Sequence, residues 1–158
     1  MDELARRLGT RLKAAKEILA TAESCTGGWA AQVVTSVAGS SAWFERGFVT
    51  YSNEAKQELL GVLQDTLQAH GAVSEETARE MARGALERSK ATVTVSITGV
   101  AGPAGGTPDK PVGTVCFAWA RGGAVRSETR RFAGDRESIR RQSVIVALEG
   151  VLRALEGG

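Results

Sequence analysis

Hydrophobic residues recur at helical spacing at the start of the chain. Leu4, Leu8 and Leu12 lie four residues apart, with polar and charged residues between them. This pattern is typical of an amphipathic helix that buries one face, so it predicts a helix over residues 2–15. The apolar positions from Val144 onward repeat in the same way and predict a last helix.

Shorter apolar runs separate these two segments. They are too brief for surface helices and rich in β-branched or aromatic residues, as strands are. Gly122-Gly123 is typical of a tight hairpin between the last two of them. The expected strands cover residues 18–22, 48–51, 92–97, 112–120 and 125–132.

Polar side chains and glycines mark the helices between the strands. After the first strand we expect a helix from about Trp29 that stops near Gly39, a residue type that often ends helices. Either Ser52 or Asn53 is suited to cap a helix after the second strand, and Ser74 to cap the next. Asp135 is suited to cap the last one.

The order of elements predicts an α/β fold, a three-layer α/β/α sandwich. Its sheet should be mixed and mostly parallel, with about five strands of which one is antiparallel, because the hairpin reverses the chain without a crossover helix. We expect a single domain over residues 1–158. Since ligands bind beyond the carboxyl ends of parallel strands, the loops after the first three strands should meet at one edge.

Composition narrows the class of protein. The formal net charge is +2, from 20 basic and 18 acidic residues, which does not favour general nucleic-acid binding. Neither a secretion signal nor an apolar run of membrane-spanning length is visible, so we expect a cytoplasmic protein without membrane partners. Two cysteines and one histidine give no metal-ligand spacing, and we expect neither metal nor cofactor.

The loop after the first strand carries the first candidate chemistry. Residues 22–28 combine hydroxyls and a thiol in Ser24, Cys25 and Thr26 with two glycines, just before a helix. Small residues and free N–H groups at a helix start suit a nucleophile and an oxyanion. The alternative is a polar connection that only caps the helix.

The next two loops add a base and a phosphate-compatible turn. Lys56 should lie in the first turn of its helix, where burial and the helix dipole lower a lysine pKa. The alternative is an ordinary exposed lysine. The loop over residues 98–106 holds four glycines suited to a phosphate, but it lacks the pattern of a nucleoside-triphosphate loop.

These segments resemble the CinA carboxyl-terminal domain family. The resemblance lies in residues 22–28 (AESCTGG), 47–56 (GFVTYSNEAK), 70–74 (HGAVS) and 98–103 (TGVAGP), with further matches around residues 110–113 and 134–136. It implies a nicotinamide-nucleotide amidohydrolase, which converts nicotinamide mononucleotide to nicotinate mononucleotide and ammonia. Longer family members add an amino-terminal domain, and we expect the domain alone here.

The resemblance also implies roles for particular residues. Ser24 would be the nucleophile, Lys56 the base, and Tyr51 its proton-relay partner, with proton transfer to Lys56 either direct or through Tyr51. Cys25 is the competing nucleophile. The residues expected to meet the substrate are Glu23, Cys25, Thr26, Gly27, Gly28, Thr98, Gly99, Ala101, Gly102, Pro103 and Arg140.

Several alternatives stay open at this point. Arg136 competes with Arg140 for the phosphate, and Glu23 either orients its turn or meets the pyridinium charge. The chain could instead be a nucleotide-binding module without turnover, linked to competence or DNA damage, or an amidase of another phosphorylated amide. The resemblance also implies self-association, so we expect a homodimer; Trp43 and Phe44 either contribute to its interface or pack in the core.

Overall fold

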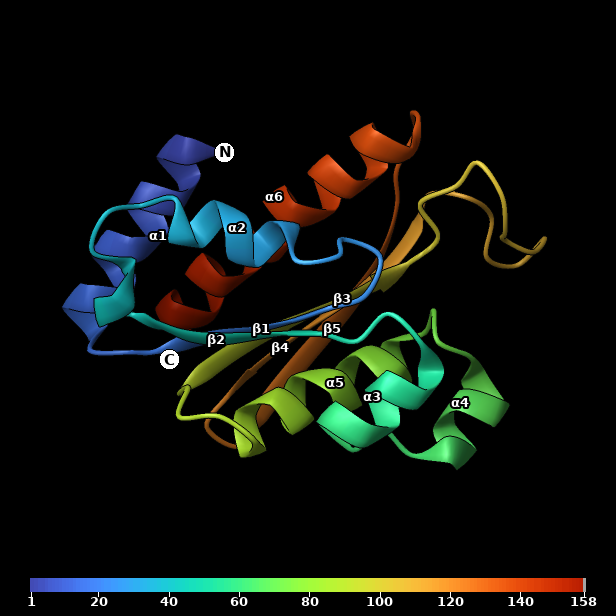
Figure 1. Ribbon diagram of the computed structural model, residues 1–158, viewed down its shortest axis with the longest axis horizontal. Coiled ribbons are helices and arrows are strands. Elements are labelled where there is room, and N and C mark those ends of the chain that lie inside the picture. Colours follow the sequence, from blue (N-terminus) through green and yellow to red (C-terminus); the bar gives the residue numbers. More distant parts are fainter. Residues whose placement is uncertain (158) are drawn as a thin grey trace.

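A five-stranded sheet separates two layers of helices in the computed structural model, which describes residues 1–157 (Figure 1). One layer holds α1, α2 and α6, and the other holds α3, α4 and α5 (Figure 1). The strands are β1 (Leu19–Glu23), β2 (Phe44–Val49), β3 (Val93–Gly99), β4 (Thr114–Arg121) and β5 (Ala124–Arg131). The helices are α1 (Asp2–Ala15), α2 (Trp29–Thr35), α3 (Asn53–Leu60), α4 (Gln64–His70), α5 (Glu75–Glu87) and α6 (Arg136–Glu156), with a 3-10 turn η1 (Ser40–Ala42).

The sheet has the order β2-β1-β3-β4-β5. β1 pairs in parallel with β2 and β3, whereas β4 pairs antiparallel with both β3 and β5. Only β4 therefore runs against the others within the described residues, and the predicted mixed three-layer fold is confirmed.

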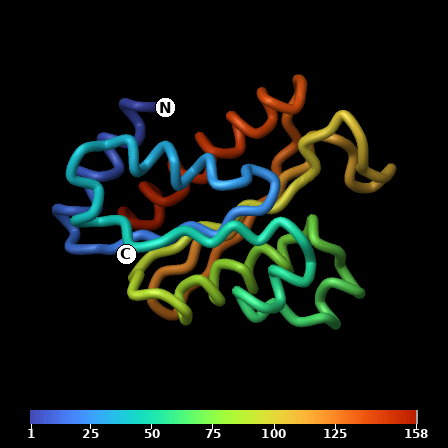
Figure 2. Tube along the Cα trace, in the orientation of Figure 1, coloured from blue at the N-terminus to red at the C-terminus, as the bar shows by residue number. Residues whose placement is uncertain are grey.

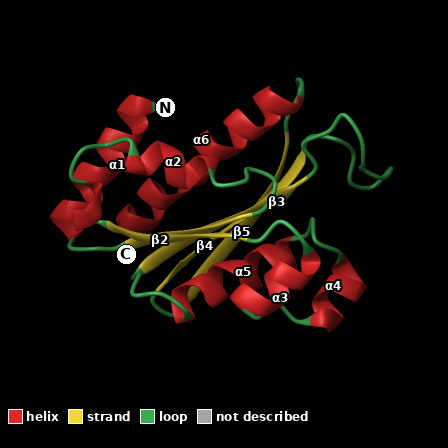
Figure 3. Ribbon diagram, viewed as in Figure 1, coloured by secondary structure: helices red, strands yellow, loops and turns green. Residues whose placement is uncertain are grey.

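The register brings three strand ends to one edge. Glu23, the last residue of β1, pairs with Val49 at the end of β2 and with Ile97 near the end of β3. Figure 2 shows the connections after β1 and β2 at the same end of the sheet. Figure 3 shows the connection from β3 to β4 as a long loop that extends away from the layers.

Some predicted boundaries are wrong. α2 ends at Thr35 instead of near Gly39, since the hydroxyl of Ser36 donates to the carbonyl of Val33 and η1 follows. β2 ends at Val49, so Tyr51 lies beyond the strand. The helix α4 was not predicted, because none of its residues is buried and its apolar pattern is correspondingly weak.

The core excludes one expected interface residue. Trp43 is only 3% exposed and packs in the main apolar cluster, where its indole lies directly against Gly9. Its side chain is therefore a core residue and offers no surface to a partner, which confirms the core alternative for Trp43 and corrects the interface role. Phe44 is half-buried against the same cluster.

No helix within residues 1–157 is both long enough and apolar enough to cross a membrane.

Candidate active site

Ser24 and Lys56 meet at the carboxyl edge of the parallel strands. Ser24 directly follows β1, and its backbone N–H donates to the carbonyl of Ile97 at 2.9 Å. Lys56 lies near the start of α3, where the hydroxyl of Ser52 caps the helix by accepting from the N–H of Ala55 at 3.0 Å. The amine nitrogen Nζ of Lys56 lies 3.0 Å from Oγ of Ser24.

The amine of Lys56 is buried without a counter-charge. The residue is 1% exposed, and within residues 1–157 no carboxylate forms a salt bridge with it. Burial lowers the pKa of Lys56 because the charged form loses its hydration. Nζ also lies 3.0 Å from the carbonyl oxygen of Thr50 and 3.3 Å from that of Tyr51. A neutral amine has two N–H groups for these carbonyls and one lone pair for the hydroxyl of Ser24.

Cys25 is a poor competitor for the role of nucleophile. Its side chain is 6% exposed, and burial raises the pKa of its thiol to about 12. Because the thiolate is the reactive form of cysteine, a thiol with this pKa is unreactive near neutral pH.

Glu23 holds the turn that carries Ser24. Its side chain is fully buried, and one carboxylate oxygen accepts from the hydroxyl of Thr26 at 2.6 Å and the N–H of Ala30 at 2.8 Å. The other oxygen accepts from the N–H of Ala31 at 3.0 Å. A carboxylate at a helix N-terminus is favourable, and here it ties the turn to α2.

Two backbone donors remain free in this turn. Gly27 donates to the carbonyl of Ser24 at 3.0 Å, and both Gly27 and Gly28 have positive φ angles, 60° and 103°. Within residues 1–157, the backbone N–H groups of Cys25 and Thr26 donate no hydrogen bond to the backbone of another residue. These two groups are available to an oxyanion next to Ser24.

A small cavity of about 180 Å³ contains the serine–lysine pair. All three predicted loops contribute to it. Its lining consists of Ser24, Cys25, Tyr51, Asn53, Lys56, Ala72, Val73, Thr98, Gly99, Ala101 and Arg136. Of the residues expected to meet the substrate, this lining does not include Glu23, Thr26, Gly27, Gly28, Gly102, Pro103 or Arg140.

Sequence reasoning missed Asn53, Ala72 and Val73. Ser52 takes the capping position of α3, and Asn53 lines the cavity. The sequence offered both residues as caps and did not distinguish them. The carbonyl of Ala72 accepts from the hydroxyl of Thr98 at 2.8 Å. This contact joins the segment between α4 and α5 to β3, and no sequence pattern indicates it.

The two candidate arginines occupy different places. Arg136 lines the cavity, and its guanidinium donates to the carbonyl of Gly102 at 2.7 Å and to the hydroxyl of Tyr51 at 3.3 Å. Arg140 donates to the carbonyls of Cys25 and Thr26 at 3.1 and 3.0 Å. Arg140 therefore supports the nucleophile turn, whereas Arg136 lies at the cavity.

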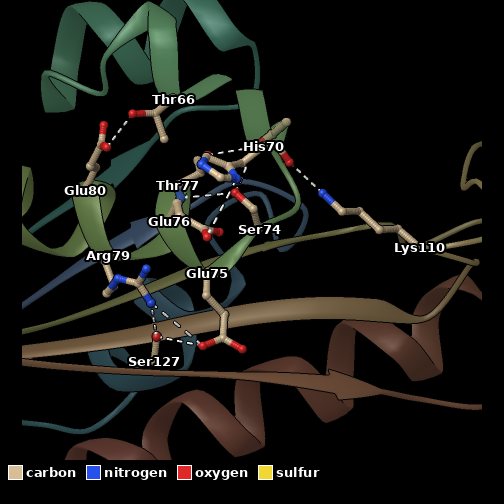
Figure 4. Close-up of polar contacts among 11 residues, drawn as sticks. Thr66, His70, Ser74, Glu75, Glu76, Thr77, Arg79, Glu80, Lys110 and Ser127 are labelled. Carbon is tan, nitrogen blue, oxygen red and sulfur yellow. Dashed lines mark hydrogen bonds and ion pairs between the residues drawn. The ribbon is translucent and has the colours of Figure 1, made fainter. Parts of the chain in front are cut away.

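A larger hollow of about 500 Å³ lies beside the α4–α5 connection. Figure 4 shows polar contacts in this region: Glu75 accepts from Ser127 at 2.8 Å, and the amine of Lys110 donates to the carbonyl of His70 at 2.6 Å. His70 itself lies 3.6 Å from Glu76. Thr129 lines this hollow and donates its hydroxyl to Glu75 at 2.7 Å, but Thr129 lies within β5, away from the loops that follow the parallel strands β1, β2 and β3. We therefore assign the chemistry to the smaller cavity, which contains the serine–lysine pair.

The fold and site define an α/β protein with a serine–lysine pair at the carboxyl edge of its parallel strands. The family model of the CinA C-terminal domain matches residues 1–155, and the chain belongs to this family. It is 56% identical over 151 residues to the nicotinamide-nucleotide amidohydrolase PncC of Escherichia coli (strain K12), covering 93% of this chain and 90% of that protein.

Two further similarities cover nearly the whole chain. The nicotinamide-nucleotide amidohydrolase PncC of Pseudomonas putida is 54% identical over 150 residues, which is 95% of this chain and 94% of that one. The solved structure of the competence/damage inducible protein CihA from Agrobacterium tumefaciens matches with a TM-score of 0.94 at 50% identity, covering 98% of this chain and 94% of that chain.

Proposed function

We propose that this protein hydrolyses the carboxamide of nicotinamide mononucleotide to nicotinate mononucleotide and ammonia. The observation that carries the proposal is the buried amine of Lys56, 3.0 Å from the hydroxyl oxygen of Ser24. A neutral amine at this distance is a general base for a serine nucleophile. The substrate follows from the names of the PncC relatives, which are nicotinamide-nucleotide amidohydrolases.

The first half of the reaction forms an ester on Ser24. The lone pair of Lys56 takes the hydroxyl proton while the serine oxygen attacks the carboxamide carbon. The N–H groups of Cys25 and Thr26 hold the resulting oxyanion, a kind of contact worth about 3–4 kcal/mol in other acyl-transfer enzymes. Lys56 then returns the proton to the amide nitrogen, the C–N bond breaks, and ammonia leaves.

The second half releases the acid. A water molecule gives a proton to Lys56 and attacks the nicotinoyl ester, and the serine oxygen leaves with that proton. Because Nζ is directly beside Oγ, neither proton transfer needs an intervening group. The direct route is therefore favoured over the relay through Tyr51, whose hydroxyl bonds Arg136.

The size of the cavity fits part of the substrate. Its volume of about 180 Å³ is below the roughly 300–1,000 Å³ typical of pockets that enclose a whole ligand. We place the nicotinamide ring inside, beside Thr98, Gly99 and Ala101, and the ribose phosphate at the rim. Arg136 is the cavity arginine and our candidate for the phosphate, since arginine pairs well with phosphate oxygens.

The test is ammonia release from the purified protein. Nicotinamide mononucleotide, nicotinamide riboside and nicotinamide are supplied in parallel, with and without a chelator. We expect chelator-insensitive release from the mononucleotide, strongly reduced release from the other two, and none with Ser24→Ala. No release from any of them contradicts the proposal and favours a nucleotide-binding module, whereas equal release from riboside and mononucleotide contradicts phosphate recognition.

Two finer points complete the proposal. We propose a cytoplasmic enzyme and a homodimer, the latter supported by exposed apolar side chains at Val49, Leu59 and Leu63, which are 47%, 46% and 62% exposed. Sedimentation equilibrium of the purified chain tests the dimer, and a monomer at micromolar concentration contradicts it.

A further inference from the structure

Tyr51 is a cavity residue whose side chain the serine–lysine chemistry does not use. Its backbone carbonyl contacts Nζ of Lys56 at 3.3 Å, which fixes the main chain at the base. Its side chain has another partner, because the phenolic oxygen accepts from Nη2 of Arg136 at 3.3 Å. The residue lines the cavity and is nevertheless 63% exposed, so its ring is accessible to a ligand.

Arg136 is held in place from two sides. While Nη2 donates to Tyr51, Nη1 donates to the carbonyl of Gly102 at 2.7 Å. Three of the five N–H groups of the guanidinium remain for a ligand. The phenol of Tyr51 and the loop at Gly102 thus set the orientation of the one arginine that lines this cavity within the described residues.

The cavity offers no carboxylate to a positively charged ring. Within residues 1–157, no Asp or Glu is part of its lining. Glu23 adjoins Ser24 in the sequence, but its side chain is fully buried and both its oxygens bond Thr26 and α2. Tyr51 supplies the only aromatic ring of the lining among these residues, and an aromatic face attracts a cation.

We propose that Tyr51 is a specificity-determining residue that recognises the positive charge of the substrate ring through its aromatic face. Its hydroxyl bond to Arg136 couples this recognition to the binding of phosphate. The substrate class is then a nucleotide whose pyridinium carboxamide is quaternised at the ring nitrogen and whose sugar carries a phosphate. This inference rests on the proposed function and names two features of the substrate that the site recognises, the charge of the ring and the phosphate.

A proton relay through Tyr51 makes the opposite prediction for the hydroxyl group. A relay needs the hydroxyl and loses turnover with Tyr51→Phe, whereas charge recognition needs the ring and tolerates that change. The two roles are therefore separable with Tyr51→Phe and Tyr51→Leu. Turnover alone does not suffice for Tyr51→Leu, because charge on the ring also changes the reactivity of the carboxamide.

The decisive experiment measures binding without turnover. In a Ser24→Ala background, nicotinamide mononucleotide and its reduced form, whose dihydropyridine ring is uncharged, are titrated by calorimetry. We expect Tyr51→Leu to raise the Kd of the oxidised nucleotide roughly 2- to 30-fold and to leave the Kd of the reduced nucleotide within about twofold. Tyr51→Phe should keep the preference for the charged ring.

A second readout uses the protein with Ser24 intact. Here Tyr51→Phe should retain kcat within about threefold and raise KM only for the phosphorylated substrate, because the bond that orients Arg136 is lost. The inference is overturned if Tyr51→Phe lowers kcat as much as Lys56→Met does. It is also overturned if Tyr51→Leu raises the Kd of both nucleotides equally. If the Ser24→Ala protein binds neither nucleotide, the proposed function falls as well; if it binds both without preference, only the role of Tyr51 falls.

Discussion

The amine of Lys56 lies 3.0 Å from the hydroxyl of Ser24, although the two residues are 32 positions apart in the chain. Strand register produces this contact. Glu23 and Val49 pair at the ends of β1 and β2, so Ser24 follows the first strand where the chain leaves the second. The cap at Ser52 then starts α3, and its first turn carries Lys56 back to the serine. The pair therefore depends on the sheet and on one helix cap.

The rate should depend on pH through Lys56. Only the neutral amine accepts the proton of Ser24, so kcat/KM should rise as pH rises through the pKa of Lys56. Because burial lowers that pKa, the rise should lie below about 10.4, where an ordinary lysine titrates. A pH–rate profile with the mononucleotide checks this. A rate that falls over the same range excludes Lys56 as the base.

Stability should follow the same titration. Between the lowered folded pKa and the ordinary unfolded one, the unfolded chain binds more protons, so the free energy of unfolding should rise with pH. Lys56→Met should remove this increase and abolish activity. Lys13→Met, which replaces an exposed lysine of α1, is the matched control and should change neither the pH dependence of stability nor the activity. Urea unfolding at several pH values gives the comparison.

Mutation should show which of Ser24 and Cys25 is the nucleophile. We expect Ser24→Ala to lower kcat at least about 10³-fold, because no covalent intermediate then forms. Cys25→Ala should retain most of the activity, since a thiol whose pKa is raised to about 12 is not the nucleophile. Iodoacetamide should label Cys25 slowly at pH 7 for the same reason. Loss of turnover in Cys25→Ala with full activity in Ser24→Ala reverses the assignment.

Alanine variants of three arginines of α6, Arg136, Arg140 and Arg141, should differ in their effects on kcat and KM. Arg136→Ala should raise KM for the mononucleotide roughly 10- to 100-fold and leave KM for the riboside unchanged, as for the loss of a charged hydrogen bond to phosphate. Arg140→Ala should lower kcat instead, because its bonds to the carbonyls of Cys25 and Thr26 hold the nucleophile turn.

Arg141→Ala is the control on the same helix. Its guanidinium lies over Trp29 and beside Glu137 and is not part of the cavity lining. Both kcat and KM of Arg141→Ala should stay near those of the unaltered protein. A larger KM effect from Arg140→Ala than from Arg136→Ala contradicts our choice of phosphate ligand.

The sequence predicts the fold well where a buried face is periodic. The helix over Asp2–Ala15 appears with its predicted bounds because leucines at every fourth position mark its buried side. The mixed sheet follows from the order of elements and from the Gly122-Gly123 turn. By contrast, α4 buries no residue, so its sequence contains no pattern from which to predict it.

The candidate site is only partly predictable for a different reason. Residues on the three strand-end loops are found from the order of strands, since that order fixes which loops share an edge. The direction of a side chain is not fixed in this way. Arg136 and Arg140 lie one helical turn apart and bond different groups, and only the three-dimensional structure separates them.

Glu23→Gln should test how the turn is held. The amide presents an NH₂ group in place of one accepting oxygen, so one of the donors at Thr26, Ala30 or Ala31 loses its partner. We expect a loss of about 1–3 kcal/mol in the free energy of unfolding, together with a lower kcat. Glu54→Gln changes an exposed carboxylate in the first turn of α3 and should have little effect on stability. Equal effects of the two variants contradict a special role for Glu23.

The packing of α3 against α5 should control the position of Lys56. Gly84 lies within α5, and a Cβ atom added there would overlap the backbone carbonyl of Leu60 at the end of α3. Helix propensity alone favours Gly84→Ala by about 1 kcal/mol. The overlap with the backbone of Leu60, however, is relieved only if α3 as a whole moves away from α5. We therefore expect net destabilisation of about 1–3 kcal/mol in urea unfolding and reduced turnover, because the shift moves Lys56 from Ser24. Gly123→Ala, where no atom of residues 1–157 lies within 4 Å of the added Cβ, should change neither the stability nor the turnover. A more stable Gly84→Ala protein with full activity would show that this contact does not set the position of the base.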